Sequence, residues 1–248
     1  MIICKSEREI NLLEKAGRLA AQAQEKMAEI IEPGITTAEI DRVAEELITR
    51  SGARPAFKGY RGFPASVCAS VNCEVVHGIP GKRVLEEGDI ISLDVGTIIE
   101  GFYGDCARTL PVGKVSKEAQ QLIEVTRQSL EKGIAQARDG ARLTDISHAI
   151  QSFAEGKGYS VVRDYVGHGI GRSMHEAPQI PNFGPPGRGP RLKKGMTLAI
   201  EPMINVGDYR VKTLKDGWTV VTLDEKLSAH FEDTIVVLGE EARILTRP

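Results

Sequence analysis

The chain has 248 residues and a formal net charge of −2, so it lacks the excess of basic residues that favours bulk binding to nucleic acid. Its four cysteines form no Cys-x-x-Cys pair and are too few for a disulfide framework at this length, which favours a reducing, cytoplasmic setting. The sequence has neither a signal-peptide pattern nor an apolar run of about 18 residues, so we expect no membrane association.

The first part of the chain predicts two helices followed by strands. Capping boxes that begin at Ser6 and Thr36 open amphipathic helices that end near residues 33 and 51. Strand-like runs follow at 66–71, 74–79, 90–98 and 102–112.

The same order begins again in the second part of the chain. Ser116 can cap a long helix that stops near residue 139, and a shorter helix is predicted near 144–155. Further strand-like runs lie near 161–166, 196–201, 218–223 and 229–238.

The repeated order indicates an internal duplication, and a shift of 106 residues also superposes Gly34 on Gly140. We therefore predict an α+β fold that forms a single domain over residues 1–248, with pseudo-symmetric halves of about 1–112 and 113–248. The strands of the two halves would share one curved sheet with helices on its outer face, which leaves the inner face free to hold a site.

Asp94 and Asp105 lie on two strand-like runs joined by a bend, where Gly101 can take the positive φ that a hairpin loop needs. A bend centred between residues 99 and 100 pairs positions whose numbers sum to 199, so we expect Asp94 opposite Asp105 within one residue of register. Opposite side chains have Cβ atoms about 4.5–5.5 Å apart. Two carboxylates that close repel each other unless they share a proton or a cation, so the hairpin predicts a cation site.

Three more potential ligands lie in or next to strand-like or glycine-rich segments, and the complete candidate set is Asp94, Asp105, His168, Glu201 and Glu232. Such an oxygen-rich set with one histidine suits Mn, Fe(II), Co or Mg better than a structural zinc site made of cysteines. Four carboxylates carry a charge of about −4, which two divalent cations would balance, so we predict a dinuclear centre.

The remaining histidines divide into two groups. His77 and His175 are candidate companions of the metal centre, since His77 directly precedes a turn and His175 lies in a glycine-rich segment that lets the backbone approach a bound group. A histidine in such a loop is more often a structural residue that forms hydrogen bonds, so this alternative stays open for both. We assign structural roles to His148, on a predicted helix, and to His230, on a predicted strand. The spacing of Cys68, Cys73 and His77 hints at zinc, but a fourth ligand is lacking, and Cys68 alternates with apolar residues as a core cysteine would.

At this level of detail the chain resembles the type I methionine aminopeptidases, in their short bacterial form, over essentially its whole length. The matching motifs are SVNCEVVHGIPG, DIISLDVG, GFYGDCARTLPVG, GHGIGRSMHEAPQIPNFG, GMTLAIEPM, DGWTVVT and SAHFEDTIVV. The resemblance implies the pita-bread fold, in which two pseudo-twofold α+β halves share a curved antiparallel sheet. The segment between Glu201 and Glu232 is too short for the helical insertion that marks type II enzymes.

The resemblance also assigns roles to single residues. It implies that the five candidate ligands hold two divalent metal ions per chain (Co, Mn or Fe(II), with Zn as an alternative), and that Asp105 and Glu232 bridge them. It places His77 and His175 in contact with the substrate. A pocket for the methionine side chain would be lined by Tyr60, Phe63, Cys68, Met174 and Trp218, with Phe57 at its edge. Bacterial relatives often have Cys at position 57 and Phe at 174, so the side-chain preference stays open.

The implied reaction is removal of the N-terminal initiator methionine from nascent proteins and peptides whose second residue is small. A metal-bound hydroxide would attack the first peptide carbonyl, because coordination lowers the pKa of water to about 7. Glu201 would handle the proton, His175 would donate to the developing oxyanion, and His77 would contact the scissile amide.

The resemblance further implies a monomer that acts on nascent polypeptide N-termini and binds no specific nucleic acid. A monovalent cation held by backbone oxygens near Asn72 and Ser228 is also implied. Four lysines either face a ribosome or are simply solvated, namely Lys193, Lys194, Lys212 and Lys215.

Three other interpretations remain open from the sequence. A proline-directed peptidase of the same fold would share the ligands, but such enzymes usually carry an extra N-terminal domain, for which 248 residues leave no room. A non-enzymatic binding module of this fold would be expected to lose ligands, and here all five candidates are present. A metalloprotein of unrelated fold would explain the acidic residues but not the repeated order of elements.

Overall fold

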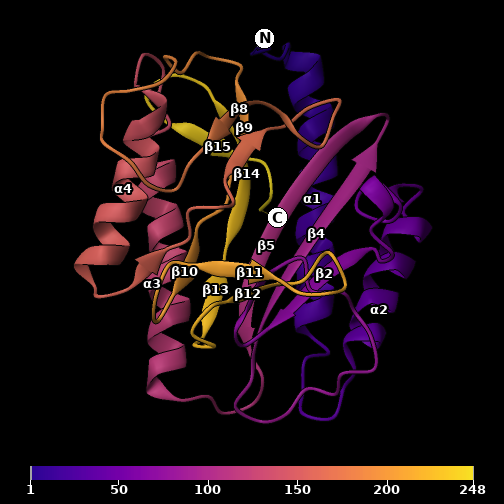
Figure 1. Ribbon diagram of the computed structural model, residues 1–248. Coiled ribbons are helices and arrows are strands. Elements are labelled where there is room, and N and C mark those ends of the chain that lie inside the picture. Colours follow the sequence, from indigo (N-terminus) through magenta and orange to yellow (C-terminus); the bar gives the residue numbers. More distant parts are fainter. Residues whose placement is uncertain (1, 248) are drawn as a thin grey trace.

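The computed structural model describes residues 2–247, which form four α-helices and a set of antiparallel sheets (Figure 1). The helices are α1 (Glu7–Ala28), α2 (Thr37–Arg50), α3 (Lys117–Ile134) and α4 (Leu143–Gly156). Strands of the first half are β1 (Arg54–Pro55), β2 (Val67–Val71), β3 (Glu74–Val76), β4 (Ile90–Ile99) and β5 (Phe102–Pro111). Strands of the second half are β6 (Ser160–Val161), β7 (Gly167–Gly169), β8 (Glu176–Ile180), β9 (Thr197–Ile200), β10 (Met203–Asn205), β11 (Val211–Thr213), β12 (Val220–Thr222), β13 (Ser228–His230), β14 (Glu232–Val237) and β15 (Ala242–Ile244).

The two halves share one sheet, as the repeated order predicts. Its order is β1-β4-β5-β14-β9-β7-β8, with β2 paired to β4 and β15 paired to β14. Strand β5 of the first half pairs with β14 of the second half, where Glu232 lies opposite Ala107 and Asp233 opposite Cys106. Two smaller sheets, β13-β10-β6 and β11-β12-β3, flank this one.

The predicted helix starts are confirmed, and their cause is local. Ser6 and Thr36 each accept a hydrogen bond from the backbone N–H three residues on, and both capping boxes are closed by a glutamate. Ser116 caps α3 through the N–H of Ala119. Helices α1 and α3 end about five residues earlier than the sequence predicts, at Ala28 and Ile134, because turn residues follow before the glycines at which we placed the ends.

The strand predictions are confirmed best for the long, regular strands. The run at 229–238 is two strands, since a break at Phe231 separates β13 from β14 and lets them enter different sheets. The run at 161–166 contributes only the end of β6. Several strands of two to five residues were not predicted, because such short segments show no hydrophobic period: β1, β7, β8, β10, β11 and β15.

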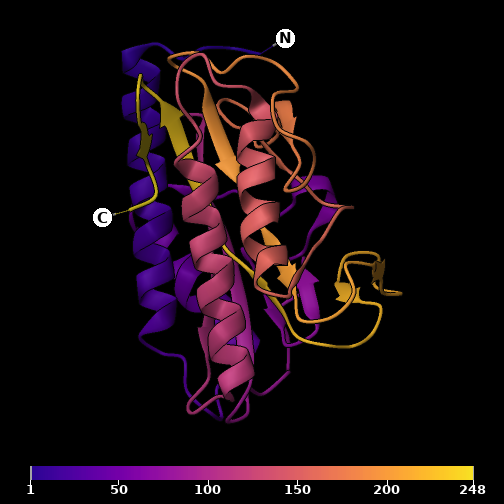
Figure 2. The same cartoon turned by 90° about the vertical axis from the view of Figure 1, so that its left-hand side faces the viewer.

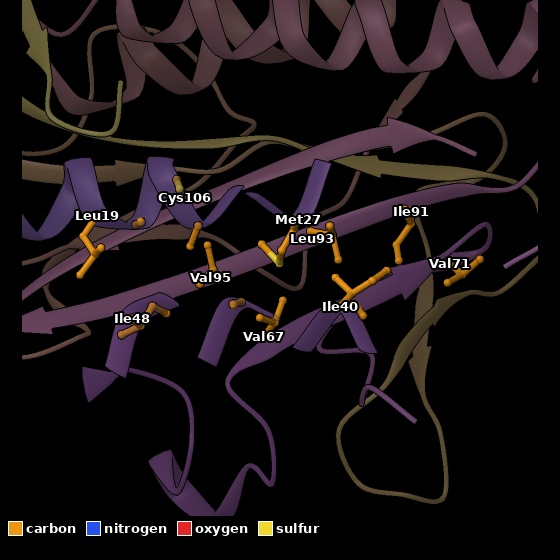
Figure 3. Close-up of a cluster of buried hydrophobic side chains, with 14 of the residues drawn as sticks. Leu19, Met27, Ile40, Ile48, Val67, Val71, Ile91, Leu93, Val95 and Cys106 are labelled. Carbon is orange, nitrogen blue, oxygen red and sulfur yellow. The ribbon is translucent and has the colours of Figure 1, made fainter. Parts of the chain in front are cut away.

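Two pairs of helices, α1 with α2 and α3 with α4, lie side by side on the outer face of the sheet (Figures 1 and 2). Below α1 and α2, buried side chains of both helices meet those of β2 and β4, among them Met27, Ile40 and Leu93 (Figure 3). Below α3 and α4, a second cluster joins Leu130 and Ile146 to residues of β8, β9 and β14. Each of these clusters buries a continuous apolar surface between a helix pair and the sheet. This burial is the main source of stability for a fold in which helices pack on one face of a sheet.

Alternation along the strands separates this core from the inner face. On β4 the core residues Leu93 and Val95 flank Asp94, so the aspartate side chain lies on the opposite face of the sheet. On β5 the same rule places Cys106 in the core and Asp105 on the inner face. The apolar layers therefore hold the strands whose other faces carry the carboxylates.

Helix α1 approaches β5 at backbone distance. A Cβ atom at Gly104 would overlap the backbone of Ala16 and Gly17, and one at Gly17 would overlap the carbonyl of Leu245. The contact has no space for a side chain, so its glycines are required by packing and not by backbone conformation.

Gly104→Ala should therefore destabilise the protein by about 1–3 kcal/mol, because the extra methyl group forces α1 away from the sheet. Urea unfolding followed by far-UV circular dichroism measures the change. The matched control is Gly156→Ala at the end of α4, where an added Cβ meets no atom within 4 Å, and which should be neutral or slightly stabilising. Equal midpoints for the Gly104 variant and the wild type would contradict the packing argument.

Candidate metal centre and pocket

The β4–β5 hairpin has a different register from the one predicted. Its strands pair Asp94 with Ala107 and Gly96 with Asp105, so paired numbers sum to 201 and not to 199. The reason is the turn, in which Glu100 and Gly101 form a two-residue loop with φ values of 51° and 81°. Positive φ at both positions is typical of a type I′ turn, which needs no third residue. The two aspartates are thus diagonal neighbours on one face, still within reach of each other.

Five strand segments bring the predicted ligands together on the inner face. The Nε2 atom of His168 lies 3.8 Å from Oδ2 of Asp105 and 3.6 Å from Oε1 of Glu201. One ligand atom each from Asp105, His168 and Glu232 lies within 4.8 Å of the others. Asp105 and Glu232 are buried, with 3% and 1% of their surfaces exposed.

The carboxylates in this cluster lack partners that would neutralise them. Within residues 2–247, no hydrogen bond reaches the buried oxygens Oδ1 of Asp94, Oδ1 of Asp105 and Oε1 of Glu232. Burial raises the pKa of Asp94 to about 7. Burial, and then repulsion by the neighbouring carboxylates, raises the pKa values of Asp105, Glu201 and Glu232 well above their usual range. Carboxylate oxygens are hard ligands, and when they are buried without a partner they suit divalent cations. Such cations would stabilise the ionised carboxylates.

On the outer face of the β5–β14 pair, the guanidinium of Arg108 neutralises the buried carboxylate of Asp233. The guanidinium of Arg108 forms an ion pair with the buried Asp233 and donates to the backbone carbonyl of Glu232. Thr246 and Arg247 near the C-terminus also contact Asp233. These bonds hold the backbone of Glu232 from the outer face, so its side chain has a defined direction on the inner face.

Three histidines at the site are neutral. Burial lowers the pKa of His77 to about 4 and that of His168 to about 3, and it is the largest cause of the lowered pKa of His175. Nδ1 of His168 lies 2.9 Å from the carbonyl oxygen of Gly169 and therefore carries the proton that it donates to this oxygen. Nε2 then has a free lone pair that faces the carboxylates.

His175 lies beside the cluster and is held by its neighbours. Its Nδ1 lies 2.8 Å from the hydroxyl of Tyr60, and its ring centroid is 4.3 Å from that of His168. The next residue, Glu176, forms an ion pair with Lys5, whose side chain is only 4% exposed. The N-terminal segment thus anchors the loop that presents His175.

A cavity of about 270 Å³ opens next to the carboxylates. It is lined by the pocket residues that the sequence predicts, Phe57, Tyr60, Phe63, Cys68, Met174 and Trp218, together with His77, His175 and the five candidate ligands. The rings of Phe63 and Trp218 pack edge to face with centroids 5.1 Å apart. Aromatic edges and two sulfur atoms thus form a wall that suits an apolar, polarisable side chain.

Sequence reasoning missed several residues of this site. Arg61, Val76, Tyr165 and Val166 also line the cavity. Tyr165 lies only three positions before His168, and the centroid of its ring is 5.5 Å from that of His77, so its closeness to the glycine-rich motif was a usable signal. His230, which we assigned to a structural role, lies with Nε2 3.8 Å from Oε2 of Glu201.

The raised carboxylate pKa values predict the pH dependence of the metal-free protein. A protonated Asp94 contributes stability below the unfolded-state pKa of about 4, and this contribution is lost as the pH rises through about 7. The melting temperature of chelator-treated protein should therefore fall between about pH 5 and pH 8, and added Mn²⁺ should reverse the fall. Asp94→Asn, which cannot ionise, should show a weaker fall. A melting temperature that rises over this range, or equal slopes for both proteins, would contradict the argument.

Comparison with known proteins relates this geometry to a family. The profile of metallopeptidase family M24 matches residues 11–238. A methionine aminopeptidase from Clostridium perfringens is 57% identical over 246 residues, with 99% of each chain covered. A crystal structure of methionine aminopeptidase from Thermotoga maritima superposes with a TM-score of 0.99 at 48% identity, over 100% of both chains.

More distant structures share the fold alone. A prolidase from Pyrococcus horikoshii OT3 is 24% identical, with a TM-score of 0.82 over 100% of this chain and 64% of its own. These matches confirm the predicted pita-bread fold of two α+β halves. Since the family profile covers most of the sequence and close relatives align from end to end, this chain belongs to metallopeptidase family M24.

Proposed function

We propose that this chain is a methionyl aminopeptidase, a hydrolase that removes the N-terminal methionine from nascent proteins and peptides when the second residue is small. One observation carries the proposal: a cavity of about 270 Å³ has the carboxylate–histidine cluster on one wall and aromatic and sulfur-containing side chains on another. A thioether side chain fits such a lining, and the cluster then lies beside the first peptide bond. The names of the full-length relatives support the same activity.

The proposed metal ligands are five residues that line the same cavity: Asp94, Asp105, His168, Glu201 and Glu232. They would hold two divalent cations, Co, Mn or Fe(II) with Zn as an alternative, and Asp105 and Glu232 are the most buried carboxylates among them. When bound, the ions would polarise the peptide carbonyl and lower the pKa of water to about 7.

The chain's own residues would orient the peptide and handle its protons. The hydroxyl of Tyr60 is bonded to Nδ1 of His175, so the neutral ring can carry its proton on Nε2 and donate it to the developing oxyanion. His77 faces the same cavity and would contact the scissile amide. Glu201 would accept a proton from the attacking water and pass it to the leaving amine.

The proposal also covers the domain organisation, the cellular setting and the partners of the chain. We infer that the halves 1–112 and 113–248 act as one catalytic domain, since the cluster combines ligands from both. Over residues 2–247 no helix is both long and apolar enough to cross a membrane. A cytoplasmic setting fits the low cysteine content, and a monomer is proposed from the resemblance alone. The N–H of Ser228 bonds to the carbonyl of Asn72 near the proposed monovalent cation. The four lysines proposed to face a ribosome are exposed.

A substrate comparison tests the activity against a proline-directed peptidase and a binding module. We expect release of methionine from Met-Ala-Ser and no hydrolysis of Ala-Pro, because the pocket recognises the first side chain. A chelator should abolish the activity and Mn²⁺ or Co²⁺ should restore it. Hydrolysis of Ala-Pro alone would favour the proline-directed enzyme. Metal binding without hydrolysis of either peptide would favour a binding module.

His175→Ala should lower kcat on the order of 10²–10³-fold, as the loss of one oxyanion donor does, while Mn²⁺ binding persists. Steady-state kinetics with Met-Ala-Ser and calorimetric titration with Mn²⁺ measure the two effects. The matched control is His148→Ala, on the exposed side of α4 and outside the cavity, which should leave both unchanged. Normal turnover in the His175 variant would remove this residue from the proposed mechanism.

A further inference from the structure

The two carboxylate oxygens of Glu201 face different partners. Oε1 lies 3.6 Å from Nε2 of His168, on the side of the proposed metal ions. Oε2 lies 3.8 Å from Nε2 of His230, on another side. Ligand atoms of Asp105, His168 and Glu232 form one compact group, and those of Glu201, His230 and Glu232 form another. His230 is therefore at the edge of the cluster, next to Glu201.

The position of His230 is fixed by its backbone. Its N–H donates to Oγ1 of Thr109 and its carbonyl accepts from the same hydroxyl, each at 2.8 Å. In the ladder between β10 and β13 it pairs with Met203, two residues after Glu201. Only 1% of its surface is exposed. A ring held in this way can move little, so its distance from Glu201 depends mainly on the glutamate side chain.

The polar edge of this ring is unused within the chain. Nε2 of His230 is buried and has no hydrogen-bond partner in the described part of the chain, residues 2–247. A buried polar group without a partner is destabilising, because it has lost its hydrogen bonds to water without gaining others. This nitrogen lies next to Oε2 of Glu201, and the backbone of His230 is fixed. We therefore expect a hydrogen bond between Nε2 and Oε2 when Glu201 is in the conformation that binds metal.

We propose that His230 is a positioning residue, whose Nε2–H donates to Oε2 of Glu201 and thereby turns Oε1 toward the metal ions. A movement of the carboxylate by roughly 0.8 Å brings the two atoms to hydrogen-bond distance. Ligating carboxylates are commonly held by such outer donors, which fix the direction of the metal-binding oxygen. The backbone of Glu201 is already held, because Nδ2 of Asn182 donates to its carbonyl at 3.0 Å.

The competing role for His230 is direct metal ligation. Ligand atoms of His230, Glu201 and Glu232 lie within 4.8 Å of one another, close enough to share one ion, whereas His230 is grouped with neither His168 nor Asp105. Distance therefore does not separate the two roles, but chemistry does. As a donor, His230 would be replaceable by another N–H donor of similar reach. As a ligand, it would supply an imidazole nitrogen, for which glutamine offers only a carbonyl oxygen, a group that suits Mn²⁺ but replaces imidazole poorly on Zn²⁺. This difference provides the test.

The inference rests on the proposed function, because it concerns a ligand of the proposed metal ions. The experiment is calorimetric titration of chelator-stripped protein with Mn²⁺ for the wild type, His230→Leu and His230→Gln, with His148→Leu as the control for loss of a histidine. Melting temperatures of the stripped proteins are measured in parallel. His230→Leu should bind Mn²⁺ about 10–100-fold more weakly with unchanged stoichiometry. His230→Gln, whose amide donates from nearly the same place, should stay within a few-fold of the wild type.

Stability supplies a second measure that does not depend on metal. Stripped His230→Leu should melt no lower than the wild type, since an apolar side chain replaces an unpartnered polar one. If this variant fails to fold, the Gln variant still decides when it is titrated with Zn²⁺ as well as Mn²⁺. Wild-type affinity for both ions supports a donor. A loss of Zn²⁺ affinity alone, or of one ion per chain, overturns the proposal, because a carbonyl oxygen replaces imidazole poorly as a zinc ligand. Equal affinities for His230→Leu and the wild type would also overturn it. A wild type that binds no Mn²⁺ would overturn the proposed function and this inference together.

Discussion

One constraint defines the site: several carboxylates are buried close together although each opposes the ionisation of the others. Desolvation and mutual repulsion both oppose ionisation of Asp105, Glu201 and Glu232, as their raised pKa values show. Their backbones cannot move apart, because each lies in or directly after a strand that is paired across the sheet. The apolar layers under the helices hold those strands in place. Divalent cations are the natural relief for this arrangement, so the metal chemistry of the family follows from the way the sheet is held.

The pairing of β5 with β14 is where the two halves become one site. Asp105 comes from the first half and Glu232 from the second, and they meet only because Glu232 lies opposite Ala107. On the outer face of the same pair, Arg108 binds Asp233 and the carbonyl of Glu232. A buried ion pair of this kind adds little net stability, but it defines the register between the halves. The site therefore needs both halves docked in one register.

Packing beside the carboxylate cluster sets the shape of the cavity. A Cβ atom at Gly96 would lie 2.8 Å from both Ala56 and a ring carbon of Phe57. The absence of a side chain there lets Phe57 close the cavity from one side while Met174 lies within 3.4 Å of the same point. Bulk at position 57 and a flexible thioether at 174 divide one space between them, so the shape of the cavity depends on the two residues as a pair.

The sequence by itself determined the local features. Capping residues such as Ser6 and Thr36 specify helix starts through bonds to their own neighbours, and alternation on β4 and β5 shows which aspartates leave the core. The tertiary structure alone decided the rest. The turn at Glu100 and Gly101 set the hairpin register, and β13 brought His230 to Glu201 across 29 positions of the chain. The hairpin register depends on the length of the turn, and the contact of His230 with Glu201 depends on strand pairing between distant segments. No residue pattern within a single strand carries either kind of information.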